Sequence, residues 1–332
     1  MQTKPNILIS RTDSIGDVVL TLPMAGWLKK QNPDCRVLFL GRSYTKDVIA
    51  LSEHVDAFIN YDELEKQDRA AQINFLLERQ IDFFVHVFPN KTIAKLAKAA
   101  KIKFRIGTTN RIYHWFTCNK LIPLSRKNSN LHEAQLNIQL LSFLNANTNV
   151  PLQDIHQYYG FSNLPSLTFD LLKILDPNKK KIILHPKSKG SAKEWGLDNF
   201  GQLIDLLPAE KFQIFISGTK QDADQMQDFL VKHQKAMNIT GKLSLAEFIV
   251  FIAECDILVA ASTGPLHIAA ALQKQSIGLY TSKRPMHPGR WAPLGLKAQP
   301  LVFDADCEKC QKGEDCNCIQ NISPQKVIEL IA

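Results

Sequence analysis

Several features that define common protein classes are missing from this 332-residue sequence. No apolar run approaches the roughly 18 residues of a membrane-spanning helix, and Lys4 and Pro5 stand where the apolar part of a signal peptide would begin. Internal repeats and low-complexity tracts are also missing. We therefore expect a globular protein of the cytoplasm.

The familiar nucleotide-binding motifs are missing as well. No Gly-x-Gly-x-x-Gly follows the first predicted strand, where Asp13-Ser-Ile-Gly-Asp17 places acids at the position of a pyrophosphate, and this argues against a Rossmann dehydrogenase. The net charge of +8 predicts an anionic partner. Because the cations are dispersed and no nucleic-acid-binding motif accompanies them, we expect that partner not to be a nucleic acid.

Strand and helix patterns alternate twice along the chain, which predicts an α/β fold with parallel sheets. The length suggests two domains, 1–165 and 166–332, joined within the Asn-, Pro- and Lys-rich stretch 147–180. Predicted strands are 6–11, 36–41, 55–59, 82–88 and 104–107, then 181–185, 212–217, 256–261, 276–280 and 299–303. Predicted helices include 16–31, 66–80, 131–146, 197–207, 220–234, 244–254 and 265–273. Ligands are expected at the carboxyl ends of the strands.

The turn after the predicted strand 256–261 is suited to phosphate. Ser262-Thr263-Gly264 precedes a helix that we expect to open with Pro265, whose missing N–H had no partner there. Gly264 allows close approach, and the free N–H groups of the first turn, near Leu266 and His267, attract anions. An ordinary turn of an α/β domain would have the same pattern.

A second segment favours the phosphate-binding interpretation. Residues 182–196 read as a buried strand followed by a polar loop. Its lysines and serines, Lys187, Lys189, Lys193, Ser188 and Ser191, offer positive charge and hydrogen-bond donors to phosphate oxygens. A solvated surface loop is the alternative, although Trp195 favours a functional loop.

Four blocks in this order resemble glycosyltransferase family 9, the lipopolysaccharide heptosyltransferases. They are the segment 9–23 with Gly16-Asp17, the loop from His185 to Trp195, the turn Ser262–His267, and the tail with Cys307, Cys310, Cys316 and Cys318. The resemblance spans residues 6 to about 325. It implies the GT-B fold: two Rossmann-like parallel-sheet domains that face a central cleft, with the acceptor on the N-terminal domain and the donor on the C-terminal one.

The resemblance also implies an activity. It is transfer of a heptose from a nucleotide sugar, ADP-heptose, onto the anionic lipopolysaccharide core, with inversion and with neither a metal nor a cofactor. The enzyme would work in the cytoplasm, in peripheral contact with the inner membrane. The alternatives are a nucleotide-sugar epimerase of the same fold, which needs acid–base groups on both faces of the sugar, and a non-catalytic sugar-nucleotide-binding protein.

Asp17 matches the catalytic base of that family. Its position alone favours an acid that interacts with a helix dipole or caps the helix, and Asp13 or Ser14 could equally serve as the cap. A carboxylate beside a helix N-terminus tends towards a low pKa, whereas a general base works best near the operating pH. Burial would offset this effect.

The resemblance assigns the donor-binding residues: Lys187, Ser188, Lys193, Asp222, Ser262, Thr263, Gly264, Pro265, Leu266 and His267. Three positions depart from the family. Gly196 replaces the Pro that commonly follows Trp, Lys187 stands where a small hydroxyl residue is frequent, and Ser262 replaces an Asp. Asp222 would bind the ribose hydroxyls, or it is simply an acid at a helix N-terminus.

The acceptor side is predicted from basic residues: Arg11, Lys91, Arg105 and Arg111. Helical spacing places Lys91, Lys95 and Lys98 on one face of a helix, opposite an apolar face. That stripe is either a solvated face or a contact with an anionic sugar or an anionic membrane.

The cysteines cluster in the tail as Cys-x₂-Cys-x₅-Cys-x-Cys, formed by Cys307, Cys310, Cys316 and Cys318. Four such residues could ligate zinc, but the second pair is closer in sequence than in common zinc ribbons, and we assign no metal. His267 is expected to contact phosphate or to pack in the turn. His86 is expected to be a hydrogen-bonded core residue, and the alternative is a place near the acceptor side.

Overall fold

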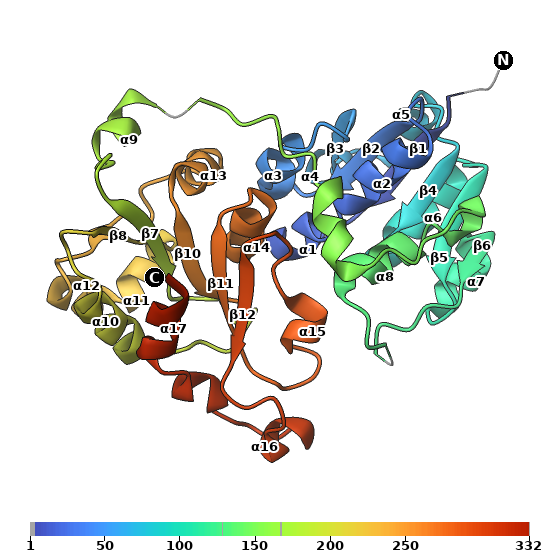
Figure 1. The fold of residues 1–332 in the computed structure, drawn as a ribbon. Coiled ribbons are helices and arrows are strands. Elements are labelled where there is room, and N and C mark those ends of the chain that lie inside the picture. Colours follow the sequence, from blue (N-terminus) through green and yellow to red (C-terminus); the bar gives the residue numbers. More distant parts are fainter. Residues whose placement is uncertain (1–3, 128, 167, 332) are drawn as a thin grey trace. The chain divides into compact units, whose positions relative to one another are not determined.

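The chain divides after Asn163 into two units, Met1–Asn163 and Leu164–Ala332, each built around one six-stranded parallel sheet (Figure 1). This computed structural model describes residues 4–127, 129–166 and 168–331. The ends of the predicted domains, residues 1–3 and 332, lie outside the described residues.

The first unit alternates strands and helices as the sequence predicts. Its strands are β1 (Asn6–Ser10), β2 (Arg36–Gly41), β3 (Ala57–Asn60), β4 (Phe83–His86), β5 (Phe104–Thr108) and β6 (Lys120–Ile122). Its α-helices are α1 (Ile15–Val19), α2 (Pro23–Gln31), α3 (Lys46–Ala50), α4 (Tyr61–Leu64), α5 (Arg69–Leu77), α6 (Lys91–Ala99), α7 (Ile112–Thr117) and α8 (Glu133–Gln139). Short 3₁₀ helices are η1 (Ser43–Thr45), η2 (Ser142–Leu144) and η3 (Leu152–Tyr158).

The second unit repeats this alternation. Its strands are β7 (Lys180–His185), β8 (Phe212–Ile216), β9 (Met237–Asn238), β10 (Ile257–Ala261), β11 (Gln275–Tyr280) and β12 (Ala298–Val302). Its helices are α9 (Phe169–Lys173), α10 (Leu197–Leu206), α11 (Lys220–Gln225), α12 (Gln227–Lys232), α13 (Leu245–Glu254), α14 (Gly264–Ala271), α15 (Pro288–Trp291), α16 (Glu308–Gln311), η4 (Cys318–Asn321) and α17 (Pro324–Ile331).

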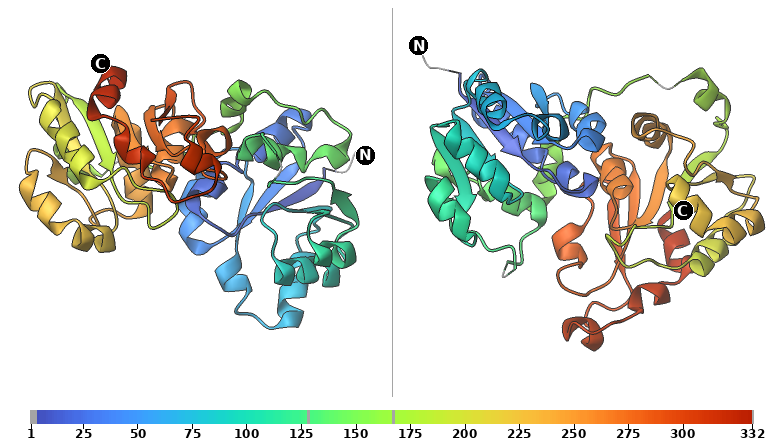
Figure 2. Two further views of the ribbon diagram at one scale, coloured as in Figure 1. Left: turned by 90° about the horizontal axis from the view of Figure 1, so that it is seen from below. Right: turned by 180° about the vertical axis from the view of Figure 1, so that it is seen from behind.

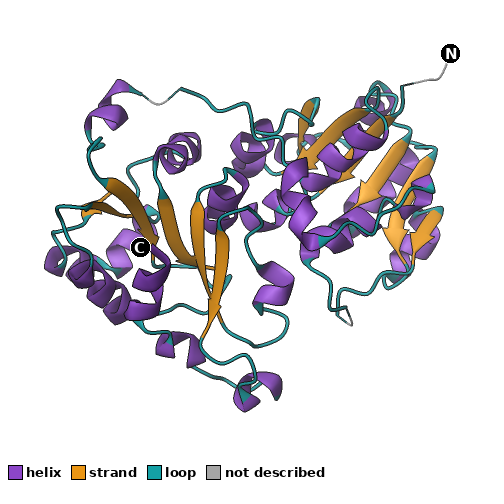
Figure 3. Cartoon of the chain, in the orientation of Figure 1, coloured by secondary structure: helices purple, strands orange, loops and turns teal. Residues whose placement is uncertain are grey.

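Both sheets have the same strand order. It is β3-β2-β1-β4-β5-β6 in the first unit and β12-β11-β10-β7-β8-β9 in the second, and all of these pairings are parallel (Figure 3). Counted from the first strand of each unit, this is the Rossmann order 3-2-1-4-5-6. The connections diverge next to β1 and β4, and next to β7 and β10. Because neighbouring loops part there, these switch points are where such sheets bind ligands.

Each sheet is buried on both faces. In the first unit, Leu8, Leu38 and Phe84 pack with α5 and α6, while their strand neighbours, such as Ile9 and Val85, are equally buried on the other face. Helices α2 and α8 pack together over that second face (Figure 2). In the second unit, one face packs with α10 and α17, and α14 packs on β10 and β11. Such double coverage explains the nearly continuous apolar strands.

The structure confirms the ten predicted strands, with ends that differ by at most two residues, and adds the short strands β6 and β9. Four long predicted helices are shorter or broken. The one predicted at 66–80 is α5, which is shorter at both ends, and the one predicted at 220–234 is two helices, α11 and α12. The helix predicted at 16–31 is two helices, α1 and α2, separated before Pro23. The helix predicted at 131–146 ends at Gln139. None of the helices within the described residues has the length and the apolar composition that crossing a bilayer requires.

Candidate functional site

The switch point of the first unit carries a buried charge cluster. Arg11 follows β1 and is 4% exposed. Its guanidinium contacts three carboxylates: Nε lies 2.6 Å from Asp13 Oδ1, Nη1 lies 3.0 Å from Glu133 Oε1, and Nη2 pairs with Asp17 Oδ1. Arg126 Nε also lies 2.9 Å from Glu133 Oε1. Three acids and two arginines are therefore joined in one cluster.

This environment changes the proton affinities of two members of the cluster. Burial alone would lower the pKa of Arg11, but the carboxylates of Asp17, Asp13 and Glu133 outweigh it, and the pKa is raised. Burial raises the pKa of Asp13 to about 6, and the neighbouring charge of Asp17 adds to this, although Arg11 opposes it. Asp13 therefore changes its charge close to neutral pH, which the sequence did not indicate.

Asp17 occupies the third position of α1 and is not its cap. The N-cap is Ser14, which makes no side-chain bond to the helix backbone; its Oγ instead donates to Asp17 Oδ2 at 2.5 Å. Asp17 is 19% exposed. Arg11 thus holds one carboxylate oxygen from the protein side, and the other oxygen is bound only by an exposed serine among the described residues.

Three further polar side chains are buried beside this switch point. Within the described part of the chain, Ser10 Oγ, both ring nitrogens of His86 and Nε2 of His114 have no hydrogen-bond partner. Ser10 is paired with His86 in the sheet, and the His86 and His114 rings lie 5.7 Å apart. Burial lowers the pKa of His86 to about 3. The expectation of a hydrogen-bonded core histidine at this position is wrong, and a water or ligand would satisfy these groups.

The basic residues predicted for an acceptor are arranged in different ways. Arg105 is tied to the backbone, since Nε donates to Thr117 O at 2.7 Å and Nη1 donates to Ile102 O. Lys91 and Arg111 are exposed. The predicted faces of the lysine-rich helix are confirmed, because Lys91, Lys95 and Lys98 of α6 are exposed and Ile93, Leu96, Ala97 and Ala100 are buried.

The predicted phosphate turn lies at the switch point of the second unit. It follows β10, and α14 begins at Gly264 with Thr263 as its N-cap, one residue earlier than predicted, so Pro265 is the second helical residue. Thr263 is 5% exposed, makes no capping bond, and Oγ1 has no partner among the described residues. The first-turn N–H groups have no carbonyl within the helix to bond. The turn thus presents a buried hydroxyl and free backbone donors.

Contacts with neighbouring elements hold this turn in place. Ser262 is hydrogen-bonded to Tyr280 at the end of β11, and Tyr280 Oη donates to Trp291 O at 2.5 Å. His267, in the first turn of α14, is 2% exposed. The turn is therefore anchored from β11 and α15.

The polar loop after β7 is internally bonded. Glu194 accepts from Lys187 Nζ at 2.6 Å and from the backbone N–H of Ser188 at 2.9 Å, while Ser188 Oγ donates to Ala192 O at 2.7 Å. Lys193 pairs with Asp315 of the C-terminal tail. These bonds give the loop a defined shape before any ligand is bound.

The neighbourhood of Trp195 explains the departure at Gly196. Trp195 is fully buried, and its indole N–H donates to Ile322 O at 2.8 Å. Gly196 follows with φ of +99°, which is open to glycine and closed to proline. The loop is therefore fixed by the buried indole and not by a proline ring.

Asp222 lies near β7 but already has bonding partners. It is 3% exposed, and its Oδ2 accepts from both the backbone N–H and the hydroxyl of Thr219, each at 2.7 Å, in a capping box at the start of α11. This geometry explains the residue as a helix cap. Ribose binding by Asp222 stays a prediction.

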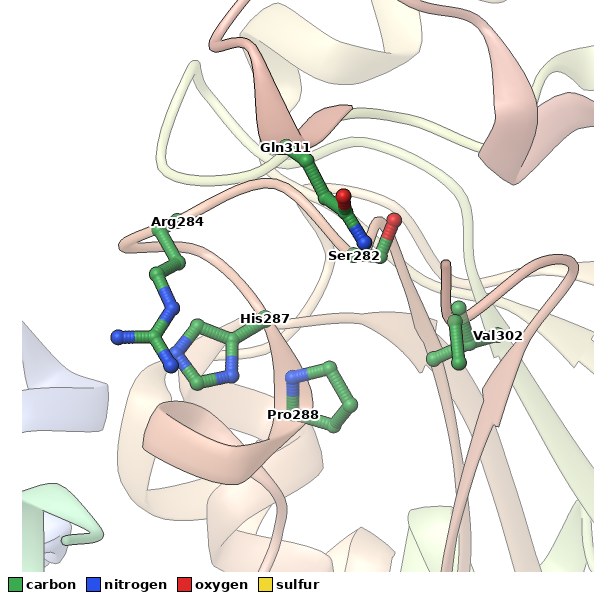
Figure 4. Close-up of a pocket in the computed structure, with 7 residues that line it drawn as sticks. Ser282, Arg284, His287, Pro288, Val302 and Gln311 are labelled. Atoms are coloured by element: carbon green, nitrogen blue, oxygen red, sulfur yellow. The ribbon is translucent and has the colours of Figure 1, made fainter. Parts of the chain in front are cut away.

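The sequence did not point to a basic pocket at the same edge of the second sheet. It has a volume of about 440 Å³ and lies beyond β11 and β12, where Arg284 and His287 line it together with Pro288, Ser282 and Val302 (Figure 4). Burial lowers the pKa of His287, and Arg284 and Arg290 add to this. The run Arg284-Pro-Met-His-Pro-Gly-Arg290, directly after a predicted strand, could have revealed it.

The chain is thus a two-unit α/β protein with a carboxylate-rich cluster at one switch point and, at the other, a helix start that presents backbone N–H groups and a buried hydroxyl. A sequence model of glycosyltransferase family 9 (heptosyltransferase) matches residues 69–319. The chain belongs to this family, and it is a glycosyltransferase. This assignment favours sugar transfer over the epimerase and over a non-catalytic binding protein.

Individual relatives agree with the family. The chain is 26% identical over 306 residues to a "Putative glycosyltransferase" of Haemophilus influenzae, covering 90% of this chain and 88% of the relative. Its fold resembles that of the glycosyltransferase family 9 protein of Veillonella parvula (TM-score 0.79, 19% identity, 100% and 97% of the two chains). It also resembles the E. coli ADP-heptose lipopolysaccharide heptosyltransferase II (TM-score 0.74, 18% identity, 98% and 97%). The GT-B fold is thereby confirmed.

The unpaired hydroxyl of Thr263 gives a test that needs no ligand. Replacing Thr263 by Val removes a buried group that has no partner in the described part of the chain, so the free energy of unfolding should fall by less than about 0.5 kcal/mol, or rise. Thr21→Val is the matched control, because Thr21 Oγ1 donates to Asp17 O at 2.8 Å, and its loss should cost about 1–2 kcal/mol. Urea unfolding measures both. A larger loss for Thr263→Val than for Thr21→Val would mean that Thr263 has a structural role.

Proposed function

We propose that this glycosyltransferase moves a heptose from ADP-heptose to the lipopolysaccharide inner core, in one displacement that inverts the anomeric centre. The observation that carries the proposal is the Gly16-Asp17 motif at the switch point after β1, with its carboxylate held by Arg11. The donor is chosen because a structural relative is an ADP-heptose heptosyltransferase. In this proposal the acceptor binds at the switch point of the first unit, and the donor binds at the switch point of the second.

In the proposed mechanism Asp17 is the general base. Arg11 fixes the orientation of the carboxylate through Oδ1, and the acceptor hydroxyl takes the place of Ser14 at Oδ2. As the hydroxyl oxygen attacks the anomeric carbon, its proton passes to Asp17 and the bond from that carbon to the diphosphate breaks. One base and direct displacement lead to inversion. Asp13 is the rival base, since its pKa of about 6 suits proton abstraction near neutral pH.

The leaving diphosphate needs compensation for its developing charge. In our proposal this comes from Lys193 and Lys187, from the hydroxyls of Ser188 and Thr263, and from the backbone N–H groups at the start of α14. Lys193 exchanges Asp315 for phosphate when the donor binds.

Because protein groups compensate this charge, the transfer step should need no divalent metal. Addition of Mg²⁺ or Mn²⁺ at millimolar concentration should leave the initial rate of transfer to a truncated core acceptor unchanged. A rate that depends on Mg²⁺, and that only Mg²⁺ or Mn²⁺ restores after chelation, would contradict the mechanism.

The role of Lys193 can be separated from that of its loop. Lys193→Ala should weaken the binding of ADP-heptose about 5- to 30-fold, the effect of losing one charge-assisted hydrogen bond at a partly exposed site. Lys189→Ala is the matched control: Lys189 is an exposed lysine of the same loop and should have little effect. Calorimetric titration measures both. Equal affinities of Lys193→Ala and wild type for ADP-heptose would show that Lys193 is not part of the donor site. If the wild type binds another nucleotide sugar and not ADP-heptose, the proposed donor is wrong.

The base can be identified by comparing two neighbouring carboxylates. Asp17→Asn should lower kcat about 10²- to 10⁴-fold while donor affinity stays unchanged, and Asp13→Asn should have a smaller effect. If Asp13 is the base, the order reverses. The wild-type rate then falls as the pH drops below about 6, where Asp13 becomes protonated, and this limb disappears in Asp13→Asn. Circular dichroism checks that both variants fold. Binding without transfer by the wild type would contradict the proposal as a whole.

We also propose that the enzyme is a cytoplasmic protein that touches the anionic inner membrane through α7. Ile112, Trp115 and Phe116 of this helix are 81%, 62% and 71% exposed. Exposed cations surround them, since Arg111 precedes the helix and Lys98 of the adjacent α6 donates to Phe116 O at 2.8 Å. An apolar tip with a tryptophan and a basic surround is suited to a headgroup layer that carries negative charge.

Vesicle binding tests this surface. Trp115→Ala with Phe116→Ala should lower the partition coefficient onto phosphatidylglycerol-containing vesicles at least about tenfold, because two large apolar side chains no longer enter the interface. Leu296→Ala, which changes a side chain 75% exposed in the other unit, is the control. Cosedimentation measures both. Equal binding to neutral and anionic vesicles would exclude the role of the cations, and an unchanged double variant would exclude α7.

A further inference from the structure

Four cysteines that are spread over twelve residues of the tail come together in space. Cys307 precedes α16, Cys310 lies within it, Cys316 lies in the loop that follows, and Cys318 begins η4. All four Sγ atoms lie within 4.8 Å of one another, with Cys307 and Cys316 at 3.6 Å and Cys310 and Cys318 at 3.4 Å. The fold therefore brings the four thiols to one point, which their spacing in the sequence did not establish.

These distances match a tetrahedral tetrathiolate site. Zinc–sulfur bonds of about 2.3 Å at tetrahedral angles place the sulfurs about 3.8 Å apart. A disulfide, by contrast, requires about 2.05 Å, and all four cysteines are free thiols. Two of the four, Cys310 and Cys318, are buried, and the other two are partly covered. An ion bound by four sulfurs here would have no open coordination position.

The surroundings provide the second shell that such a site requires. Thr281 Oγ1, just beyond β11, lies 3.3 Å from Cys310 Sγ and 3.6 Å from Cys318 Sγ, and the backbone N–H of Cys318 donates to Cys316 Sγ at 3.3 Å. Such contacts orient thiolates and spread their charge. A divalent ion with four thiolates carries two net negative charges, and lysines at 283, 309 and 312 lie on or beside this loop.

Residues 303–317 of the tail have little hydrophobic burial to hold them in place. Of residues 303–317, only Cys310 is buried, so this segment adds almost no apolar side chains to the core of the unit. Hydrophobic burial is what normally offsets the loss of chain entropy, and where it is missing, small motifs rely on cross-links or metals. The convergence of four thiols on one point of an otherwise exposed loop is explained by an ion at its centre.

We propose that Cys307, Cys310, Cys316 and Cys318 bind one structural zinc ion through four thiolates and thereby anchor the loop 307–318 to the carboxyl end of β11. The ion takes no part in sugar transfer, because a closed four-sulfur shell leaves no position for substrate or water.

Elemental analysis of the full-length protein tests the site without any reference to activity. Protein purified without a chelator and without a histidine tag should contain about one zinc ion per chain. Cys310→Ser with Cys318→Ser should abolish the binding, whereas Cys35→Ser with Cys255→Ser, which changes two buried cysteines elsewhere, should retain it.

A second measurement covers the case in which the tail variant does not fold. Wild-type protein, stripped of metal under reducing conditions and titrated with Co²⁺, should develop a thiolate charge-transfer band and the intense visible bands of tetrahedral cobalt at one equivalent, and Zn²⁺ should displace them. Iron in place of zinc, with a tetrathiolate spectrum, would overturn the choice of ion. Folded wild-type protein that binds neither Zn²⁺ nor Co²⁺, or that contains two disulfides after anaerobic purification, would overturn the site.

Discussion

The reversal of strand order at the middle of each sheet is the constraint on which the rest of this structure depends. Parallel strands end at one edge, so every loop that follows a strand leads to that edge. The connections diverge between β1 and β4 and between β7 and β10. The backbone and the polar side chains at these points are not covered by a neighbouring crossover connection. Arg11 follows β1, and Thr263 follows β10 within two residues. The positions of both candidate sites therefore follow from topology before any side chain is considered.

Chemistry at the first switch point is governed by the cost of burying charge. Arg11 is removed from water almost completely, which is tolerable only because carboxylates surround it. The three carboxylates of Asp13, Asp17 and Glu133 share the one guanidinium of Arg11. Glu133 also pairs with Arg126. Burial raises the pKa of Asp13 to about 6, Arg11 opposes this shift, and the neighbouring charge of Asp17 adds to it. Arg11 thus holds the carboxylate of Asp17 in place and only partly offsets the effect of burial on Asp13.

The sequence was sufficient for whatever depends on local pattern. Apolar runs buried on two faces predicted ten strands, and the Ser-Thr-Gly-Pro turn predicted a polar helix start. What it could not provide were partners far apart in the chain. Glu133 lies 122 positions from Arg11, and Asp315 lies 122 positions from Lys193, so neither pairing has a local signature. The strands β6 and β9 have three and two residues, too few for a pattern to register. The unsatisfied ring of His86 depends on packing that periodicity does not encode.

The C-terminal tail contacts the polar loop after β7 at two points. Trp195 is buried and bonds to the backbone of Ile322, so the polar loop after β7 and the end of the tail are fixed to each other by one indole. A few residues away, Asp315 pairs with Lys193 and directly precedes Cys316, one of the four converging thiols. An exposed ion pair alone would hold Lys193 only weakly. If the loop that carries Asp315 is fixed at its base, the pair loses less entropy on forming, and Lys193 is held at the loop in the absence of ligand. In the proposed donor site, a phosphate would have to compete with Asp315 for Lys193. The order of the tail would then affect how firmly Lys193 is held and how readily it exchanges Asp315 for phosphate.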